Sequence, residues 1–370
     1  MKWSPQQEAA LKAVAKWLAD PKGPQVFRLF GFAGVGKTTL AKEIAQMVKG
    51  AVLYATFTGK AALVLRKKGC AGASTIHSLI YRPEGEDGEQ PVFVLNRDSA
   101  LATAKLAIID EVSQVNEVLG KDLLSFKTKI LVLGDPAQLP PVSGEGFFIN
   151  AKPDFMLTEI HRQAADNPIV RLSMDVREGR GLQVGTYGDS RVVRRGDISK
   201  DEMRALVMSA DQLLCGTNKS RQAFNDRVRE IHGRCGLAAP HHPVPGDRLV
   251  CLRNDREKNL LNGGLWEAVT ASEKKGKIEI TARSLDDVMS DAKVKVPVEF
   301  FSGTEKELPW EKLRNLQQFT FGYALTGHKA QGSQWDNVVL FDESRVFREN
   351  ATKHLYTCVT RAAERITVVV

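Results

Sequence analysis

The sequence has few cysteines, and their spacing excludes the usual cysteine-based sites. Five cysteines are scattered over 370 residues, and none forms a C-x-x-C pair. His241 and His242 have no cysteine beside them at the spacing of zinc ligands. An odd, scattered set of this kind is typical of reduced thiols in a cytosolic protein. The sequence therefore argues against a zinc site and a disulfide framework.

Long apolar runs are absent as well. No run approaches the ~20 apolar residues that a membrane-spanning helix needs, and residues 1–8 lack the apolar segment of a signal peptide. We therefore expect a cytoplasmic protein that does not contact a membrane.

The charged residues that are present have an excess of one sign. The composition is 43% hydrophobic and 26% charged, with a formal net charge of +8. Such an excess favours a polyanionic partner, because lysines and arginines that neutralise phosphates release condensed counterions. Many basic proteins bind no nucleic acid, so charge alone leaves both interpretations open.

Short apolar runs alternate with helical patterns in the first half of the chain, which predicts an α/β fold with a parallel sheet covered by helices. Strands are predicted at 26–30, 51–55, 106–109 and 130–133, and helices at 38–48 and 60–68. A second α/β unit is expected from about Lys152, with strands at 213–215 and 366–370. A solvated turn at 83–88 and a strand at 92–95 predict a small insertion, and turn signals between 246 and 318 predict a small β barrel.

A glycine-rich segment between the first strand and the first helix carries the clearest chemical signal. Residues 31–38, GFAGVGKT, fit the G-x-x-x-x-G-K-[ST] pattern, in which backbone N–H groups cradle phosphates. Lys37 would reach the β- and γ-phosphates, and the Thr38 hydroxyl would bind magnesium. ATP and Mg²⁺ are therefore the predicted cofactors. The predicted nucleotide contacts in this segment are Gly34, Val35, Gly36, Lys37, Thr38 and Thr39.

Polar side chains follow two further strands. Asp110 and Glu111 come after the apolar run 106–109, where a carboxylate faces the crevice of an open α/β sheet. We expect Asp110 to hold the magnesium ion and Glu111 to polarise the attacking water. Gln138, in GDPAQLPP at 134–141, has an amide that can contact both the γ-phosphate and the water. A proline-braced turn without function explains that segment equally well.

The order of these motifs resembles the RecD/Dda branch of superfamily 1 helicases. Later segments agree with it: LTEIHRQ at 157–163, LTGHKAQGS at 325–333 and LYTCVTRA at 355–362. The resemblance implies two RecA-like domains with ATP between them, a β-hairpin pin in the first and an SH3-like β-barrel insertion in the second. The implied ranges are 1–150 for the first domain, about 81–100 for the pin, 151–245 plus 321–370 for the second domain, and 246–320 for the barrel.

The resemblance also assigns roles to single residues around the nucleotide. Arg162 and Arg361 match arginine fingers, which stabilise charge on the γ-phosphate. Gly332 matches a nucleotide contact from the second domain. Gln7 matches the glutamine that reads adenine, and Gln6 is an alternative register.

Other residues match the motifs that contact the nucleic-acid strand. Phe57 stands where most relatives carry proline, and it is either a stacking platform for a base or a core residue at a strand end. Phe93 is a candidate wedge at the tip of the pin, and Lys329 a candidate phosphate contact. The predicted strand contacts are Phe57, Thr58, Lys60, His77, Thr326 and His328.

The resemblance thus implies an ATP-dependent DNA helicase that moves 5′ to 3′ on single-stranded DNA and unwinds tailed duplex DNA. We expect a monomer, without an extra N-terminal domain, whose candidate partners are replication or recombination proteins. Two alternatives stay open. One is a strand-binding clamp that nucleotide switches on and off, and the other is an RNA-directed helicase, which would recognise the 2′-hydroxyl.

Overall fold

The computed structural model describes residues 3–87, 90–141, 144–159, 167–235, 239–255, 257–286, 290–309, 313 and 316–370, without the side chains of 85–91. The contacts divide the chain into two compact units. Unit 1 comprises Met1–Glu86, Pro91–Leu182 and Phe347–Thr360, and unit 2 comprises Asp87–Gln90, Gln183–Val346 and Arg361–Val370. Within the described ranges, no helix combines the length and the apolar character needed to cross a membrane.

Unit 1 is built on a parallel six-stranded sheet with the strand order β3-β2-β6-β7-β1-β8. Its strands are β1 Val26–Gly31, β2 Val52–Thr56, β3 Ser74–Thr75, β6 Leu106–Asp110, β7 Ile130–Gly134 and β8 Phe155–Leu157. The four strands predicted from continuous apolar runs are confirmed, because both faces of this sheet are covered.

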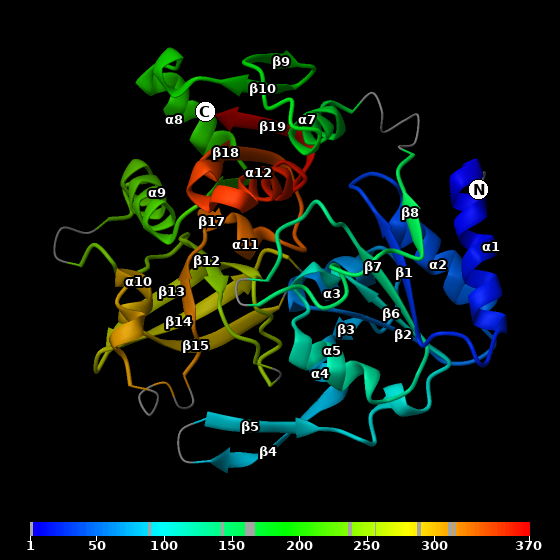
Figure 1. The fold of residues 1–370 in the computed structure, drawn as a ribbon. Coiled ribbons are helices and arrows are strands. Elements are labelled where there is room, and N and C mark those ends of the chain that lie inside the picture. Colours follow the sequence, from blue (N-terminus) through cyan, green and yellow to red (C-terminus); the bar gives the residue numbers. More distant parts are fainter. Residues whose placement is uncertain are drawn as a thin grey trace. The chain divides into compact units, whose positions relative to one another are not determined.

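Helices cover the two faces of the sheet in unit 1 (Figure 1). Successive residues of a strand point to opposite faces, so Phe27 and Leu29 of β1 join one apolar cluster, and Val26 and Phe30 join the other. The first cluster includes residues of α1 and α2, and the second includes residues of α4 and α5. The helices of this unit are α1 Pro5–Ala19, α2 Lys37–Met47, α3 Gly59–Lys67, α4 Ile76–Ile80, α5 Glu117–Leu124, α7 Pro168–Arg177 and α12 Ala351–Val359.

A two-stranded ribbon leaves the sheet of unit 1 after α4. It consists of β4 Tyr81–Asp87 and β5 Gln90–Leu95, so the strand predicted at 92–95 is confirmed. The solvated turn predicted at 83–88 is wrong, because Pro83 to Asp87 continue β4; Gly88 lies outside the described residues. A strand in a two-stranded ribbon has one unpaired edge, and proline is tolerated there despite its missing N–H.

Unit 2 contains a second six-stranded sheet, with the order β17-β11-β18-β19-β10-β9. Its pairs are parallel except for β9 and β10. The strands are β9 Gly185–Tyr187, β10 Ser190–Val193, β11 Gln212–Cys215, β17 Ala324–Thr326, β18 Trp335–Phe341 and β19 Ala362–Val369. The helices of unit 2 are α8 Lys200–Ser209, α9 Asn218–Ile231, α10 Glu299–Ser302 and α11 Gly327–Ala330.

An antiparallel five-stranded sheet with the order β15-β14-β13-β12-β16 is inserted in unit 2. Its strands are β12 Arg248–Cys251, β13 Leu265–Lys274, β14 Lys277–Ser284, β15 Asp291–Pro297 and β16 Phe319–Phe321. Lys275 and Gly276 both have positive φ (55° and 72°), as a tight hairpin turn requires. Trp266 and Phe319 of this sheet belong to the same apolar cluster as Leu213 of β11, so the inserted sheet shares its core with the rest of unit 2.

The boundary between the units differs from the one expected near Lys152. The short strand β8 pairs with β1, and α7 packs against α12 inside unit 1. A strand of three residues carries too little pattern to show which sheet it joins, and α12 lies far from the rest of unit 1 in sequence. These contacts become visible only in three dimensions.

Two side chains of α12 attach it to loops of unit 1. The Tyr356 hydroxyl accepts a hydrogen bond from the Ala33 N–H (2.9 Å) and donates one to the Asp135 carboxylate (2.7 Å). The Thr357 hydroxyl accepts from the Leu139 N–H (2.9 Å). Tyr356 is only 1% exposed, and burial raises the pKa of its hydroxyl, which keeps it a neutral donor.

Replacing Tyr356 by phenylalanine should destabilise unit 1 without altering its ring packing. The change removes the partner of the Ala33 N–H and of a buried carboxylate, so we expect a loss of about 1–3 kcal/mol in the free energy of unfolding. Urea unfolding followed by hydrogen exchange of unit 1 amides measures this loss. Tyr54→Phe is the matched control, because its hydroxyl makes no hydrogen bond within the described parts of the chain. If both variants lose the same free energy of unfolding, the two hydrogen bonds of the Tyr356 hydroxyl do not stabilise unit 1.

Candidate nucleotide and nucleic-acid site

The predicted catalytic residues of unit 1 lie at one edge of its sheet. Strands β2, β6, β7 and β1 are consecutive neighbours and all run in the same direction, so the segments that follow them meet at the carboxyl edge. Thr56 lies opposite Asp110 in the register, and Phe30 lies opposite Gly134. Ligands of open α/β sheets bind at this edge. The fold therefore brings together the phosphate loop, Asp110, Glu111 and Gln138.

The phosphate loop connects β1 to the N-terminus of α2. Gly34 and Gly36 have φ values of 83° and 82°, a left-handed conformation that favours glycine. Gly31 is needed for a different reason, because a Cβ atom there would lie 2.7 Å from Val35 and 2.8 Å from Leu157. The Lys37 ammonium donates to the carbonyl oxygens of Gly31 (2.6 Å) and Phe32 (3.0 Å), which keeps its charge over the loop.

Thr38 and Asp110 form the oxygen pair predicted to hold magnesium. The Thr38 hydroxyl lies 3.4 Å from the Asp110 carboxylate. The pKa of Asp110 is raised to about 6, chiefly by burial and then by the neighbouring Glu111, while Lys37 acts in the opposite direction. A divalent cation would offset the cost of burying this carboxylate, and Mg²⁺ prefers oxygen ligands such as these. The residues therefore fit the cation.

Glu111 has a strained backbone. Its φ and ψ of 55° and 44° are left-handed, which costs a residue with a side chain roughly 1–2 kcal/mol. In this conformation its N–H donates to the Asp110 carboxylate (2.8 Å). Strain of this kind is concentrated at functional sites, where surrounding structure enforces it. The predicted role of Glu111 in polarising a water stays a prediction.

The loop after β7 holds a buried carboxylate and a side-chain amide oxygen that has no partner among the described residues. Asp135 is 3% exposed, and burial raises its pKa, although Lys37 and the Tyr356 hydroxyl act in the opposite direction. The Gln138 side-chain oxygen is buried and has no hydrogen-bond partner among the described residues. A buried unpaired acceptor is costly and needs an explanation, which a bound water or nucleotide would give.

The structure separates the two glutamines at the start of α1. The Gln7 amide lies against the phosphate loop, because its nitrogen donates to the Val35 carbonyl (3.1 Å) while its oxygen accepts from the Ser4 N–H (3.1 Å). The Gln6 oxygen accepts from the N–H groups of Thr158 and Glu159 (both 2.8 Å). Gln7 is therefore the glutamine beside the nucleotide loop, and Gln6 anchors the segment after β8.

Of the predicted strand contacts in unit 1, Phe57 and His77 are exposed. Phe57 is 38% exposed at the carboxyl end of β2, so the alternative of a core phenylalanine is wrong. The His77 ring packs on Tyr81 and Phe93, with ring centroids 4.7 Å apart in both pairs. Lys60 is buried, at 8% exposure, and the Thr58 hydroxyl caps α3 by accepting from the Ala61 N–H (3.2 Å).

Phe93 does not lie at the tip of the hairpin. It is an exposed residue within β5, three positions after the strand begins at Gln90. The prediction of Phe93 as a wedge tip is therefore wrong. The error came from placing the turn too early, at Pro83.

In unit 2, the predicted contacts lie between the last residue of β17 and the start of β19. The Thr326 hydroxyl caps α11 by accepting from the Lys329 N–H (3.4 Å), and His328 is half-buried, which lowers its pKa. Gly332 has a φ of 75°, and the Arg361 guanidinium, 6% exposed, donates to the Ser333 carbonyl (3.3 Å). Lys329 is exposed, with its ammonium 3.3 Å from Asn262. Arg162 lies outside the described residues.

Sequence reasoning missed Thr217 and Tyr356. Thr217 ends the loop after β11, next to β17, and its hydroxyl caps α9 as that of Thr326 caps α11. A sequence pattern could have identified Thr217: a threonine at or just after the end of a strand, followed within three residues by lysine or histidine. The same pattern occurs at Thr58, Thr75 and Thr326. Tyr356 belongs to the motif LYTCVTRA, in which only the arginine had been considered.

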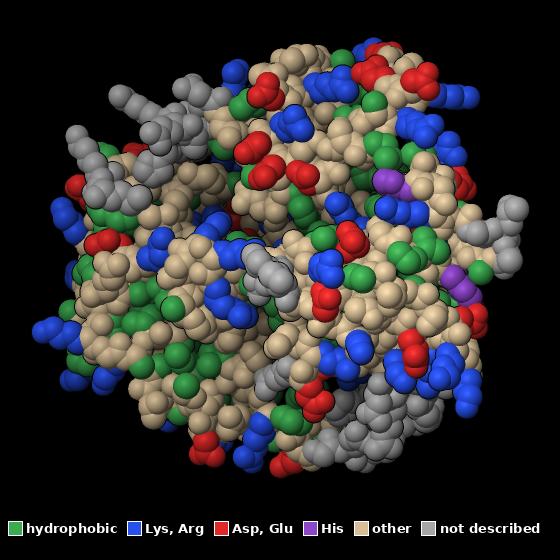
Figure 2. Space-filling view, turned by 180° about the vertical axis from the view of Figure 1, so that it is seen from behind, with side chains coloured by type: hydrophobic (Ala, Val, Ile, Leu, Met, Phe, Trp, Pro, Cys, Tyr) green, Lys and Arg blue, Asp and Glu red, His purple; other side chains and the backbone are tan. Residues whose placement is uncertain are grey.

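Surface charge does not mark a nucleic-acid path by itself. Lys and Arg side chains are spread over the face in Figure 2, with Asp and Glu between them. The net charge of +8 is therefore not gathered into one patch on that face. Assignment of strand contacts has to depend on the loops at the sheet edges.

Comparison with known proteins agrees with this site. A family model described as an AAA domain matches residues 2–197, more than half of the chain, and a model described as a UvrD-like helicase C-terminal domain matches residues 321–369. The ATP-dependent RecD2 DNA helicase of Deinococcus radiodurans is 29% identical over 368 residues, which cover 93% of this chain and 46% of that protein. The ATP-dependent DNA helicase dda of Enterobacteria phage T4 is 32% identical over 252 residues, or 60% of this chain and 56% of the relative.

The chain thus spans about half the length of these two relatives. Among solved structures, Bacteroides Pif1 bound to single-stranded DNA has a TM-score of 0.59 at 16% identity, with 99% of this chain and 92% of the other covered. That likeness shows a shared α/β fold. The chain belongs to the AAA domain family whose model matches its phosphate-loop half, and it is similar to the ATP-dependent DNA helicases RecD2 and dda.

Proposed function

We propose that this protein is an ATP-driven motor that moves along single-stranded DNA and unwinds duplex DNA. The observation that carries the proposal is the convergence of Lys37, the Thr38–Asp110 pair and Glu111 at one sheet edge, beside the unpaired Gln138 oxygen. The relatives named above are ATP-dependent DNA helicases. Units 1 and 2 would contain the two RecA-like domains, residues 246–320 an SH3-like insertion, and the β4–β5 ribbon the pin.

Each residue of the edge has a role in phosphoryl transfer. The loop N–H groups and Lys37 bind the phosphates, and the Gln7 amide, released from the loop, reads the adenine. Thr38 and Asp110 would hold Mg²⁺, which supplies positive charge next to the phosphates. Glu111 takes the proton of the attacking water, and the Gln138 oxygen orients that water. The catalysis is positioning and electrostatic stabilisation.

Arg162 and Arg361 would act as arginine fingers, which can accelerate hydrolysis by about 10³–10⁵-fold. The protein would exist in two states, one in which the arginine fingers contact the phosphates and one in which they do not. If ATP binds the first state more tightly, it shifts the population toward that state, and hydrolysis reverses the shift. If the affinities of the two units for the strand alternate in step with this change, the protein advances along the strand. Phe57, Thr58, Lys60 and His77 would hold the strand in unit 1, and Thr326 and His328 in unit 2.

A nucleotide-switched clamp needs tight binding and slow turnover, and would not need a strained Glu111 or an unpaired Gln138 for hydrolysis. The two classes separate in an unwinding assay on duplexes with a single 5′ or 3′ tail, made of DNA or RNA. We expect ATP-dependent displacement with the 5′-tailed DNA duplex. Strand binding that responds to ATP without displacement of any duplex would establish the clamp instead.

The Lys37→Ala variant should lose strand-stimulated ATP hydrolysis by about 10²–10³-fold, because the variant lacks the cation that stabilises charge on the phosphates. Binding to a single strand should be largely retained. Steady-state ATPase assays and fluorescence anisotropy measure the two properties. Lys42→Ala, on the same helix but outside the loop, is the control. Normal hydrolysis in Lys37→Ala would rule out the phosphate site.

The Glu111→Gln variant should separate nucleotide binding from hydrolysis. An amide of nearly the same shape cannot accept the proton of the water, so we expect the hydrolysis rate to fall by about 10²–10⁴-fold. The affinity for ATP, measured with a fluorescent analogue, should stay within a few-fold of the original value. Glu117→Gln, at an exposed ion pair with Lys121, is the matched control. A variant that hydrolyses ATP normally would remove Glu111 from the mechanism.

Substitutions of Phe57 test base stacking. Stacking on an aromatic face contributes about 1–3 kcal/mol per base, so Phe57→Ala should weaken single-strand binding roughly tenfold. Phe57→Leu keeps apolar area but no aromatic face, and should weaken binding similarly. Phe57→Trp should retain it. The affinities for an oligothymidylate are measured by fluorescence anisotropy. If all three variants bind it as tightly as the original protein, Phe57 does not contact the strand.

A further inference from the structure

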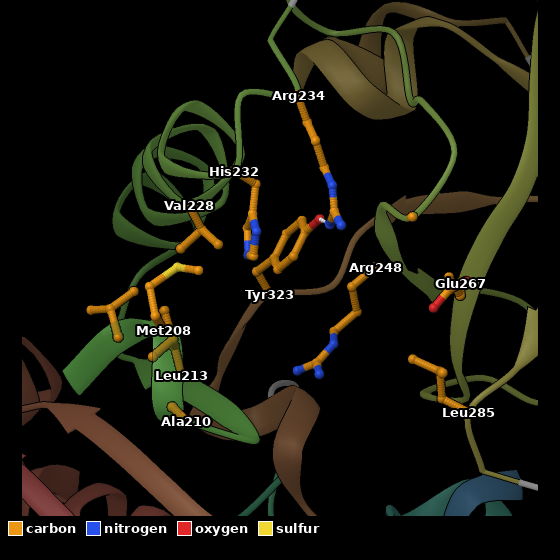
Figure 3. A pocket seen from close by; sticks show the side chains of 12 residues that line it. Met208, Ala210, Leu213, Val228, His232, Arg234, Arg248, Glu267, Leu285 and Tyr323 are labelled. Carbon is orange, nitrogen blue, oxygen red and sulfur yellow. Dashed lines mark hydrogen bonds between the residues drawn. The ribbon is translucent and has the colours of Figure 1, made fainter. Parts of the chain in front are cut away.

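Unit 2 contains a cavity of about 260 Å³ that the proposed motor does not use. It lies where α8, α9 and β11 meet strands β12 and β13 of the inserted sheet. Figure 3 shows Arg234 extending to the Tyr323 hydroxyl and Arg248 extending along the cavity away from it, with apolar side chains along one wall. We call it the Arg234–Arg248 cavity.

The two guanidinium groups have spare hydrogen-bonding capacity. Arg234 donates to the Tyr323 hydroxyl and Arg248 donates to the Asp211 carbonyl, while each guanidinium carries five N–H donors. Within the described ranges, neither arginine forms an ion pair with a carboxylate. The nearby Asp247 is fully buried and is occupied by Arg229, 3.1 Å away. Both cavity arginines can therefore bind an anion.

The electrostatics of the cavity favour a negatively charged ligand. Burial lowers the pKa of Arg248, and burial followed by the charge of Arg234 lowers the pKa of His232, which stacks on Tyr323. A buried positive charge without a counter-charge is costly, and an anion that pairs with it recovers part of that cost. Glu267 also lines the cavity, which limits the favoured ligand to a small net negative charge.

The remaining lining is apolar. Leu213 and Val228 are buried in the wall, whereas Met208 and Leu285 are 41% and 47% exposed at the cavity. The volume is below the ~300–1,000 Å³ of sites for drug-sized ligands, so the cavity suits a single group about the size of one amino-acid residue. The ligand therefore combines an anionic head with a compact apolar body.

The cavity is separate from the predicted strand contacts of the same unit. Ala210 and Tyr323, which line it, precede β11 and β17, whereas Thr217 and Thr326 lie at the carboxyl ends of those two parallel strands. Substrates of open α/β sheets bind at the carboxyl edge. The cavity opens near the other end of the strands, so its ligand is not the DNA held by Thr326 and His328.

We propose that the Arg234–Arg248 cavity binds the C-terminal carboxylate of a partner protein whose last residue is apolar. Arginine pairs with a carboxylate through two parallel hydrogen bonds, and capture of a chain end is a common mode of peptide recognition. A terminal residue has a chain on one side only, and can enter a cavity of this size. A phosphate inside a nucleic-acid strand carries a nucleotide on each side, and would also leave the apolar wall without a partner.

The experiment uses the full chain and two labelled hexapeptides of glycine and serine that end in leucine, one with a free carboxylate and one with an amide. Fluorescence anisotropy should show at least tenfold weaker binding of the amide, a comparison that needs no variant. Arg248→Gln should weaken binding of the free acid at least tenfold. Arg204→Gln, an exposed arginine on α8 outside the cavity, should leave it unchanged. ATP hydrolysis should be the same in both variants.

Several results would overturn the proposal. Equal affinity for acid and amide, or no binding of the acid at millimolar concentration, would exclude a carboxylate site. Displacement of the peptide by inorganic phosphate at similar concentration would show a phosphate site instead. Displacement by an oligothymidylate would assign the cavity to the DNA path. None of these results affects the ATPase predictions, because Lys37 and Glu111 belong to unit 1.

Discussion

Two carboxylates at the carboxyl edge of one sheet, the half-buried Asp110 and the buried Asp135, determine much of unit 1. A buried charge is costly unless hydrogen bonds and opposite charges surround it. Backbone N–H groups from Glu111 and Ala137 donate to them, at 2.8 and 3.0 Å, and the charge of Lys37 lowers the pKa of both. The strained backbone of Glu111 is part of this arrangement, because the left-handed turn places its N–H on Asp110. Structure and predicted chemistry therefore share the same groups.

The hydroxyl of Tyr356 connects this edge to a distant part of the sequence. It holds a loop N–H at Ala33 and a carboxylate at Asp135, so a movement of the phosphate loop has to change at least one hydrogen bond of α12. Along the chain, Arg361 comes two positions after the end of α12 and belongs to unit 2. The path from the phosphate loop to this arginine therefore consists of one buried hydrogen bond and a short stretch of chain. This gives a motor of the proposed kind a physical element through which the state of the loop can be sensed.

Continuous apolar runs predicted the inner strands of unit 1 and the phosphate-loop helix well, because strands buried on both faces have to be apolar throughout. The motif residues were brought to one edge because parallel strands force their carboxyl ends together. Prediction failed where a short element depends on a partner. Pro83 indicated a turn but lies in a strand of the β4–β5 ribbon. The same error led to the wrong prediction that Phe93 lies at the tip of the hairpin. The short strand β8 was expected in the second domain but pairs with the first sheet. Tyr356 was missed because its two contacts join residues more than two hundred positions away.

The net charge of +8 predicted a polyanionic partner but gave no location, and the reason lies in how single cations are neutralised. Arg229 is fully buried, yet Asp247 and three backbone carbonyls satisfy it, so it contributes to the fold and not to binding. Arg248, half-buried at the start of β12 and next to Asp247 in the chain, has a lowered pKa and no carboxylate partner within the described structure. Composition counts the two arginines equally. Only Arg248 would be stabilised by binding an anion. Cations without a carboxylate partner therefore indicate candidate binding sites better than the total charge does.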